Sequence, residues 1–273
     1  MVGIKRMRHA ACIEMSQYGV VMLSQVQPHH LIHECHVCEP RGGCLGLQLL
    51  DSEKARDQLS HAKKISRKCE HVFREGEDAD CFYVLRSGSV KSYLVTEDGE
   101  EQVLGFYLPG DVFGLDTTDT LLRMSSAVAL ETVSVCRFPH AYLGDKAQGA
   151  SLLKITAEQM QRDHNLVLML ARKDADGRIA SFLDDLACRY WSRGYSSLAF
   201  VLTMSRQDIG CYLGLAVETV SRTLTRFQEC GVLNVNRREV EILDQATLRK
   251  IAGTRVSSAS PSGRQQEVEL KPV

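Results

Sequence analysis

The feature that most constrains the fold of this sequence is a series of short apolar segments with a period of two, running from Cys69 to about Phe138. Such a period places every second side chain on one face of a strand, and turn residues such as the Asp98–Gly99 pair separate the segments. The predicted strands cover residues 82–84, 90–95, 103–108, 126–130 and 134–138. Short strands at this spacing are typical of an antiparallel sandwich or barrel.

From residue 151 to about 186 the apolar residues recur at helical spacing, which predicts one long helix. Residues 166–171 are apolar on nearly all sides, a pattern that a helix tolerates only when it is buried on more than one side. A dimer seam and packing against the helix's own domain both satisfy that requirement, and the sequence leaves both interpretations open.

A second, basic unit follows. Residues 187–255 contain ten Lys or Arg and six Asp or Glu, whereas the whole chain carries a net charge of −1. Within this unit, Ser205 and Asp208 form a capping-box pattern that predicts a helix start, and Gly214 predicts a tight turn. A second helix is predicted over 217–229. Helix, short glycine-containing turn and helix are the signature of a helix-turn-helix.

The second predicted helix carries Glu218, Ser221 and Arg222 at positions i, i+3 and i+4, so these side chains lie together on one surface. Arginine binds a guanine edge with two hydrogen bonds, and glutamate accepts from cytosine, so the surface suits a major groove. Two apolar segments around Arg237 and Arg238 predict a two-stranded wing with a basic tip. An amphipathic helical hairpin with solvated charges is the alternative interpretation.

Three cysteines near the N-terminus, Cys35, Cys38 and Cys44, have the spacing C-x2-C-x5-C. Thiolates packed this closely repel one another unless a cation lies among them, which favours a metal ion or an iron–sulfur cluster. A structural zinc site and a redox disulfide pair are the alternatives that the spacing leaves open. His33 and His36 are further candidate ligands, although surface histidines are the commoner case.

The first thirty residues lack a continuous apolar segment, so we expect no secretory signal, and no run of residues is long enough to predict a membrane span. We therefore expect a soluble cytoplasmic protein with reduced thiols. Among the remaining cysteines, Cys81, Cys188 and Cys211 have apolar or helical neighbours and are predicted to be core residues.

Together these motifs resemble the Crp/Fnr superfamily of bacterial transcription regulators, and within it the oxygen-sensing FNR/ANR branch. The resemblance runs from about Cys35 to Ala252 and rests on four stretches: C-x2-C-x5-C, residues 86–93, residues 129–132 leading to Cys136, and residues 208–222. It departs from the family at Ala216, where a Ser or Thr helix cap is usual.

The resemblance implies an oxygen-responsive regulator, usually an activator, that holds a [4Fe–4S] cluster and loses DNA binding when oxygen degrades the cluster. The implied cluster ligands are Cys35, Cys38, Cys44 and Cys136. It also implies a homodimer on double-stranded DNA at an inverted repeat with TTGAT half-sites. Glu218, Ser221 and Arg222 would read base edges. Arg237 and Arg238 on the wing would also bind the DNA. The hairpin of Thr96, Glu97, Asp98, Gly99 and Glu100 matches a surface that contacts RNA polymerase in relatives.

The expected fold class is α+β, in five parts. These are an N-terminal segment with the cluster cysteines (1–50), a cyclic-nucleotide-binding-like β-roll (51–150), a long dimerisation helix (151–186), a winged helix-turn-helix (187–252) and a disordered tail (253–273).

Two other functions compete with this interpretation. A cyclic-nucleotide receptor of the Crp type places a Glu after the Gly-Asp turn and an Arg-Ser or Arg-Thr pair further on. This chain has Leu115 at the first place and Arg123 followed by Met124 at the second. The second competing function is an enzyme. The sequence contains no nucleophile elbow, P-loop, dinucleotide-binding glycine motif or metalloprotease helix, so we expect no enzymatic activity.

Overall fold

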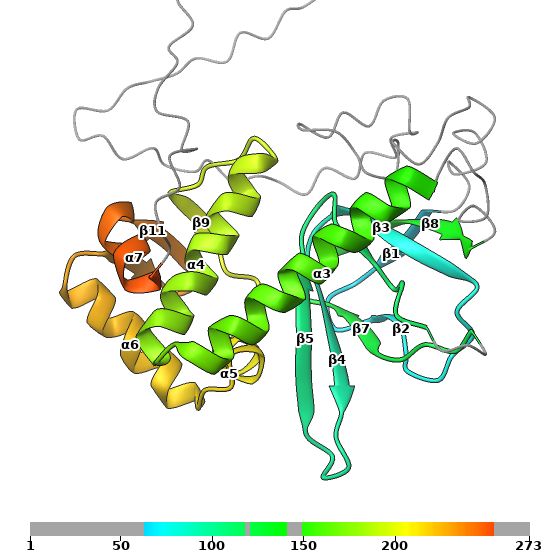
Figure 1. Cartoon of the computed structure of the whole chain (residues 1–273), viewed down its shortest axis with the longest axis horizontal. Helices are drawn as coiled ribbons and strands as arrows, with labels where there is room; N and C mark the ends of the chain where they lie inside the picture. The colour runs from blue at the N-terminus through cyan, green and yellow to red at the C-terminus, as the bar shows by residue number, and fades with distance from the viewer. Residues whose placement is uncertain (1–62, 118–120, 141–148, 254–273) are drawn as a thin grey trace, which may run out of the picture. The chain divides into compact units, whose positions relative to one another are not determined.

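The structure, a computed structural model, describes residues 63–117, 121–140 and 149–253 (Figure 1). Two four-stranded sheets form the N-terminal part of this region, and all their strand pairings are antiparallel. One sheet has the order β1-β8-β3-β6, formed by Lys63–Ser66, Val133–Pro139, Cys81–Ser87 and Val112–Phe113. The other has the order β2-β7-β4-β5, formed by His71–Phe73, Ser126–Ala129, Val90–Val95 and Glu101–Tyr107.

Alternating side chains from both sheets fill the interior of this β-roll, as the period of two requires. Its core includes Leu85, Val90, Phe113, Ala129 and Val135, each almost fully buried. The period of two therefore predicted the sandwich architecture correctly. The strands that it did not reveal are β1, β2 and β6, which have between two and four residues and are too short to show a period.

The range 151–186 is two helices and not the single helix that the sequence predicted. Helix α3 spans Gly149–Arg172 and helix α4 spans Ala175–Ser192. Asp174 follows the end of the first by two residues and caps the second, because its side chain accepts a hydrogen bond from the backbone N–H of Gly177. An aspartate that satisfies the free N–H groups of a new helix start competes with continuation of the old helix.

The C-terminal part is a winged helix-turn-helix. Helix α5 (Arg206–Leu213) and helix α6 (Val217–Glu229) are joined at Gly214, which has the positive φ of 62° that favours glycine. Strands β9 (Ala199–Val201), β10 (Leu233–Asn236) and β11 (Glu239–Ile242) form the sheet of the wing, and helix α7 (Gln245–Ala252) follows. The structure confirms the capping box at Ser205 and Asp208.

The buried face of α6 consists of Val220, Leu224 and Phe227, as the sequence predicted, together with Thr223. The three apolar residues belong to a cluster that extends through α4, α5 and α7 and reaches Val103 and Phe106 of strand β5. The helix-turn-helix is therefore packed both on α4 and on the roll, which fixes the direction of its second helix.

Candidate functional site

Helix α6 presents Glu218, Ser221 and Arg222 to solvent, on the side opposite its buried residues. The hydroxyl of Ser221 donates to the backbone carbonyl of Val217 at 3.0 Å, which leaves its oxygen lone pairs available to an incoming donor. Ala216 occupies the N-cap position and makes no side-chain cap hydrogen bond. Glu218, Ser221 and Arg222 thus form an exposed polar surface on one side of α6.

The wing places Arg237 and Arg238 at the exposed turn between β10 and β11. Arg237 has a positive φ of 54°, and its carbonyl accepts from the Arg206 guanidinium at 3.3 Å, which connects the wing to the first residue of α5. The carbonyl of Arg238 accepts from the backbone of Leu202 at 2.7 Å. The turn is thus held by its main chain, while both arginine side chains are exposed.

The predicted cluster ligands divide between the described and the undescribed parts of the chain. Cys136 lies on β8, half-exposed, with its Cα opposite Lys63 of β1 and Val84 of β3. Because side chains alternate along a strand, it lies on the face away from the buried Val133 and Val135. Cys35, Cys38 and Cys44 lie outside the described residues.

Among the residues that the structure describes, no group of three His, Cys, Asp or Glu side chains gathers in a way that could hold a metal ion. A cluster at Cys136 therefore requires ligands from the N-terminal segment. That segment enters the roll at Lys63, directly opposite Cys136, and Cys44 precedes Lys63 by 19 positions. At about 3.3 Å per extended residue this length of chain easily spans the neighbourhood of Cys136. The donor set fits a thiolate-held cluster in chemistry and in chain length.

The roll interior shows how Arg123, the residue that a cyclic nucleotide would need, is used here. Arg123 is 2% exposed and donates to the carbonyl of Gly114 at 2.6 Å and to that of Cys81. Its guanidinium carbon lies 4.4 Å from the ring centroid of Phe73 and 5.4 Å from that of Tyr83. The group is engaged with main chain and aromatic rings inside the roll.

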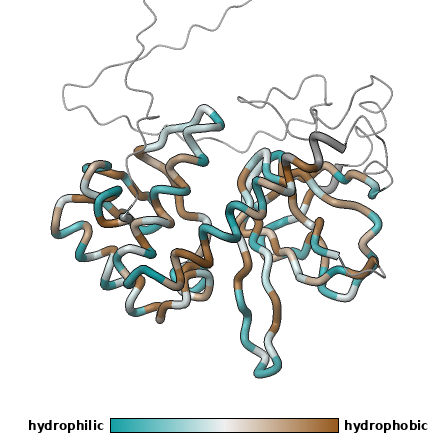
Figure 2. The backbone as a smooth tube through the Cα atoms, viewed as in Figure 1, coloured by the Kyte–Doolittle hydropathy of each residue, from teal (hydrophilic) through white to brown (hydrophobic). Residues whose placement is uncertain are grey.

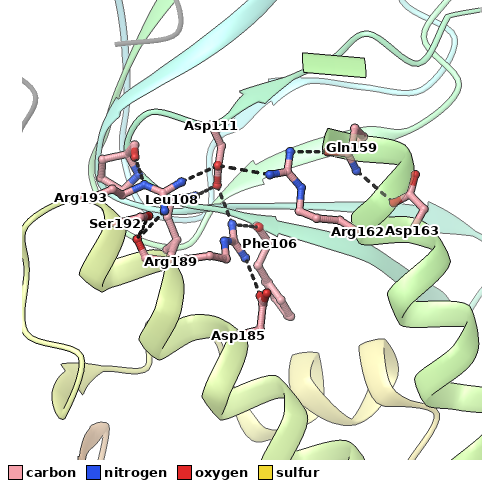
Figure 3. A network of polar contacts seen from close by, with 11 residues as sticks. Phe106, Leu108, Asp111, Gln159, Arg162, Asp163, Asp185, Arg189, Ser192 and Arg193 are labelled. Carbon is pink, nitrogen blue, oxygen red and sulfur yellow. Dashed lines mark hydrogen bonds and ion pairs between the residues drawn. The ribbon is translucent and has the colours of Figure 1, made fainter. Parts of the chain in front are cut away.

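The Gly-Asp turn of the roll carries an ionic network that the sequence did not predict (Figure 3). The buried carboxylate of Asp111 accepts from Arg189 of α4 and from Arg193, the residue that caps the end of α4, each at 2.5 Å, and lies 4.0 Å from Arg162 of α3. It also accepts from the backbone of Leu108 at 2.8 Å. Burial alone raises the pKa of Asp111, but the guanidinium groups of Arg189 and Arg193 outweigh it and hold the pKa below its usual range. Asp111 therefore connects the roll to both long helices.

The tip of the β4–β5 hairpin, residues 96–100, is exposed and hydrophilic (Figure 2). Thr96 and Glu100 close the turn through their backbones at 2.9 Å, and Gly99 has a positive φ of 81°. The structure confirms this turn, whereas its contact with RNA polymerase stays a prediction.

Helix α3 bears exposed apolar side chains seven residues apart. Leu153, Met160 and Val167 are 72%, 53% and 62% exposed. A spacing of seven puts one line of side chains along a helix at the period of a coiled-coil seam. An apolar stripe of this kind on a surface helix is a candidate helix–helix contact.

The remaining cysteines differ in part from their predicted positions. Cys81 is buried as expected, and Cys211 is half-buried, but Cys188 is exposed near the end of α4 and is not a core residue. Sequence reasoning placed Cys188 inside because its neighbours Leu186 and Ala187 are apolar. Those two side chains face the core, and Cys188 lies just outside that buried stripe.

Within the described residues, no helix is long and apolar enough to cross a membrane.

Two family matches cover much of the described region. Residues 64–148 match the cyclic nucleotide-binding domain family, and residues 202–233 match the family of bacterial regulatory proteins named crp. The two matches coincide with the β-roll and with the helix-turn-helix.

The similarity to known proteins extends over most of the chain. It is 40% identical over 235 residues to the transcriptional activator protein Anr of Pseudomonas protegens, which covers 84% of this chain and 96% of that protein. It is 38% identical over 225 residues to the fumarate and nitrate reduction regulatory protein of Vibrio cholerae, covering 80% and 90%. A similar solved structure is FixK2 from Bradyrhizobium japonicum, with a TM-score of 0.64, 32% identity and coverage of 69% and 96%.

Proposed function

Because the chain belongs to the Crp/Fnr family of bacterial transcription regulators, we propose that it is an oxygen-responsive activator of the FNR type. Proteins of this family are DNA-binding regulators of transcription and not enzymes. The finer proposal is that a homodimer binds an inverted repeat with TTGAT half-sites while a [4Fe–4S] cluster is intact, and releases DNA after oxygen has degraded the cluster. Because promoter DNA lies in the bacterial cytoplasm, the proposal includes a cytoplasmic location.

The observation that carries the proposal is the exposed triplet of Glu218, Ser221 and Arg222 on α6, beside a wing with two exposed arginines. A negative Glu218 facing a polyanion is unfavourable unless it accepts a specific hydrogen bond from a base. Its presence beside Arg222 therefore favours reading of sequence over general attraction to phosphate. Arg237 and Arg238 supply the general attraction.

For the sensor, Cys35, Cys38, Cys44 and Cys136 would hold the cluster, whose contribution when bound is an oxygen-labile thiolate link between the N-terminal segment and β8. Cys136 lies on the strand that pairs with β1, the strand into which the cysteine segment leads. The same strand pairs with β3 of the roll. A constraint applied at Cys136 thus acts on the centre of one sheet of the roll.

A homodimer through α3 is part of the proposal because two recognition helices are needed for a two-fold repeat. The exposed line of Leu153, Met160 and Val167 supplies an apolar contact surface at coiled-coil spacing. Arg162 of the same helix approaches Asp111 of the roll, so pairing of α3 is coupled to the roll through the ionic network.

A cyclic-nucleotide receptor is the main alternative, and the interior of the roll weighs against it. The Arg123 guanidinium contacts main-chain carbonyls and aromatic faces, and Asp111 pairs with Arg189 and Arg193 at the end of α4. A nucleotide phosphate would have to displace these contacts, leaving carbonyl oxygens unpaired in the core. A zinc- or thiol-based redox regulator on the same fold is a second alternative.

The test is anaerobic purification, followed by an optical and a Mössbauer spectrum, iron and sulfide analysis, and DNA binding before and after exposure to air. The proposal expects a brown protein that binds the TTGAT repeat anaerobically and loses that binding in air. A colourless protein with stoichiometric zinc would overturn the cluster. A titration with cyclic AMP that restored DNA binding would establish the alternative.

A further inference from the structure

The ammonium of Lys91 joins the roll to the helix-turn-helix. It lies 2.7 Å from a carboxylate oxygen of Glu101, across the β4–β5 hairpin, and 2.6 Å from one of Asp208 on α5. The side chains of Lys91 and Asp208 are only 11% and 14% exposed, whereas that of Glu101 is 48% exposed. An ion pair so well shielded from water is stronger than an exposed one.

Asp208 is also the partner of the N-cap residue Ser205 in the capping box of α5, since its carboxylate accepts from the backbone N–H of Ser205 at 2.9 Å. Burial raises the pKa of Asp208, but the bonds from Lys91 and Ser205 outweigh it and hold the pKa below its usual range. The carboxylate is therefore ionised near neutral pH and attracts Lys91 while it caps the helix. One side chain fixes both the start of α5 and its contact with the roll.

Two further contacts join the roll to α5, and both depend on the orientation of the groups that make them. The amide of Gln102 donates to the backbone carbonyl of Cys211 at 2.8 Å. The rings of Phe106 and Tyr212 meet edge to face, with centroids 5.1 Å apart. Strand β5 thus contacts the last turn of α5, and Lys91 of β4 supplies the charged contact at the first turn.

The base-reading side of the domain is open in this arrangement. Glu218, Ser221 and Arg222 of α6 are exposed while Lys91 is bonded to Asp208. Contact with the roll therefore does not cover the recognition surface. It restricts the directions that the helix-turn-helix can take, which favours the orientation seen here over the many others that a tethered domain could sample.

We propose that Lys91 is a positioning residue for DNA binding, which holds α5, and through it the recognition helix α6, through its ion pair with Asp208. The inference rests on the proposed function, because it assumes that α6 reads the DNA. The apparent dissociation constant is the intrinsic one divided by the fraction of molecules in the competent orientation. Loss of this ion pair lowers that fraction and weakens binding to every sequence by the same factor.

The experiment measures binding of anaerobic, cluster-loaded full chain to the TTGAT repeat and to single-base variants of it at several salt concentrations. For Lys91→Gln we expect about three- to tenfold weaker binding, an unchanged ranking of sites and an unchanged salt dependence. Lys91→Arg keeps the charge and should bind close to wild type. Glu101→Gln removes the carboxylate on the same hairpin, does not break the link to α5, and serves as the matched control with little effect.

A double-mutant cycle tests whether Lys91 acts through Asp208. In the Asp208→Asn background, Lys91→Gln should have little further effect on the DNA dissociation constant. Thermal unfolding and sedimentation of each variant establish that it is folded and dimeric.

Unchanged or tighter DNA binding by Lys91→Gln would overturn the inference. A salt slope that falls by about one would overturn it as well, because Lys91 would then be a phosphate contact. A wild-type protein that fails to bind the repeat in any redox state would instead overturn the proposed function.

Discussion

The guanidinium of Arg178 donates to the backbone carbonyl of Leu213 at 2.9 Å, so a residue of α4 closes the last turn of α5. The same side chain donates to the carbonyls of Leu170 at 2.8 Å and Lys173 at 3.0 Å, at the end of α3. The last carbonyls of a helix have no partner within the helix and carry partial negative charge, which a guanidinium satisfies. Arg178 thus joins the end of the proposed dimerisation helix to the turn of the helix-turn-helix.

Replacing Arg178 with Met keeps the apolar stem and removes these hydrogen bonds. We expect the free energy of unfolding to fall by about 2 kcal/mol, because several carbonyls lose a charged donor. DNA binding should weaken as well. The measurement is urea unfolding, with Arg172→Met as control, since Arg172 is exposed at the end of α3. An equal loss of stability in both variants would refute the bridging role.

The ionic network at Asp111 makes stability depend on pH in a defined direction. The pKa of Asp111 is lower in the folded chain than its usual value, so its contribution to stability is present above about pH 4, the ordinary value for aspartate. It is lost as the pH falls through the folded-state pKa. Asp111→Asn should therefore destabilise the protein by about 3 kcal/mol at neutral pH, because Arg189 and Arg193 lose a buried anion.

The difference in unfolding free energy between wild type and Asp111→Asn should shrink as the pH falls below about 4. Denaturant titrations of the protein at several pH values measure it. Asp98→Asn, at the exposed hairpin tip, is the control and should leave the pH profile unchanged. A difference that stayed constant down to pH 2 would mean that the carboxylate charge does not stabilise the network.

Features set by neighbouring residues were predictable from the sequence. The bounds of α6, the capping box at Ser205 and the turn at Gly214 follow from local patterns, and the structure confirms them. The exposed position of Glu218 and Arg222 follows equally from helical periodicity. The break at Asp174 was not predicted, because the apolar spacing continues across it and an aspartate inside a helical pattern is common.

Contacts between distant residues were not predictable. Lys91 and Asp208 are 117 positions apart, and Asp111 and Arg189 are 78 positions apart. No periodicity connects such pairs, since their meeting depends on how two domains pack. The Gly-Asp pattern predicted a turn, but it did not predict that the carboxylate of this aspartate is buried. Asp111 could have been noticed only as a charged residue between apolar segments, a pattern that also fits a solvated turn.

One prediction concerns Cys136, which is the one proposed cluster ligand among the residues that the structure describes. Cys136→Ser should abolish retention of iron and sulfide and, with it, anaerobic DNA binding, because serine is a poor ligand for such a cluster. Iron and sulfide analysis after anaerobic reconstitution measures this. Cys188→Ser and Cys230→Ser change exposed cysteines and should keep the full load. A full iron and sulfide load in Cys136→Ser would remove this residue from the ligand set.

The apolar stripe of α3 predicts the site of dimerisation. Val167→Glu places a charge at a 62% exposed position that the proposed seam would bury, and should weaken the dimer by at least about tenfold, or about 1.4 kcal/mol. Sedimentation equilibrium of the anaerobic protein measures the change. Asn165→Glu adds the same charge at an exposed position of the same helix off the stripe and should leave the dimer intact. Equal dissociation in both variants would point to general repulsion.

The last prediction separates residues that read sequence from residues that attract DNA. Arg222→Ala should cost about 1–3 kcal/mol in binding to the TTGAT repeat and relax the preference at one base pair, because two hydrogen bonds to a guanine edge are lost. Glu218→Ala should weaken discrimination more than affinity, since it also removes repulsion from phosphate. Neutralising Arg237 or Arg238 should instead weaken all sites alike and flatten the salt dependence, because these exposed wing residues act through counterion release. Binding of each variant to the repeat and to single-base changes of it, across several salt concentrations, measures both effects. If Glu218→Ala left the ranking of sites unchanged, α6 would contact DNA without reading its sequence through that residue.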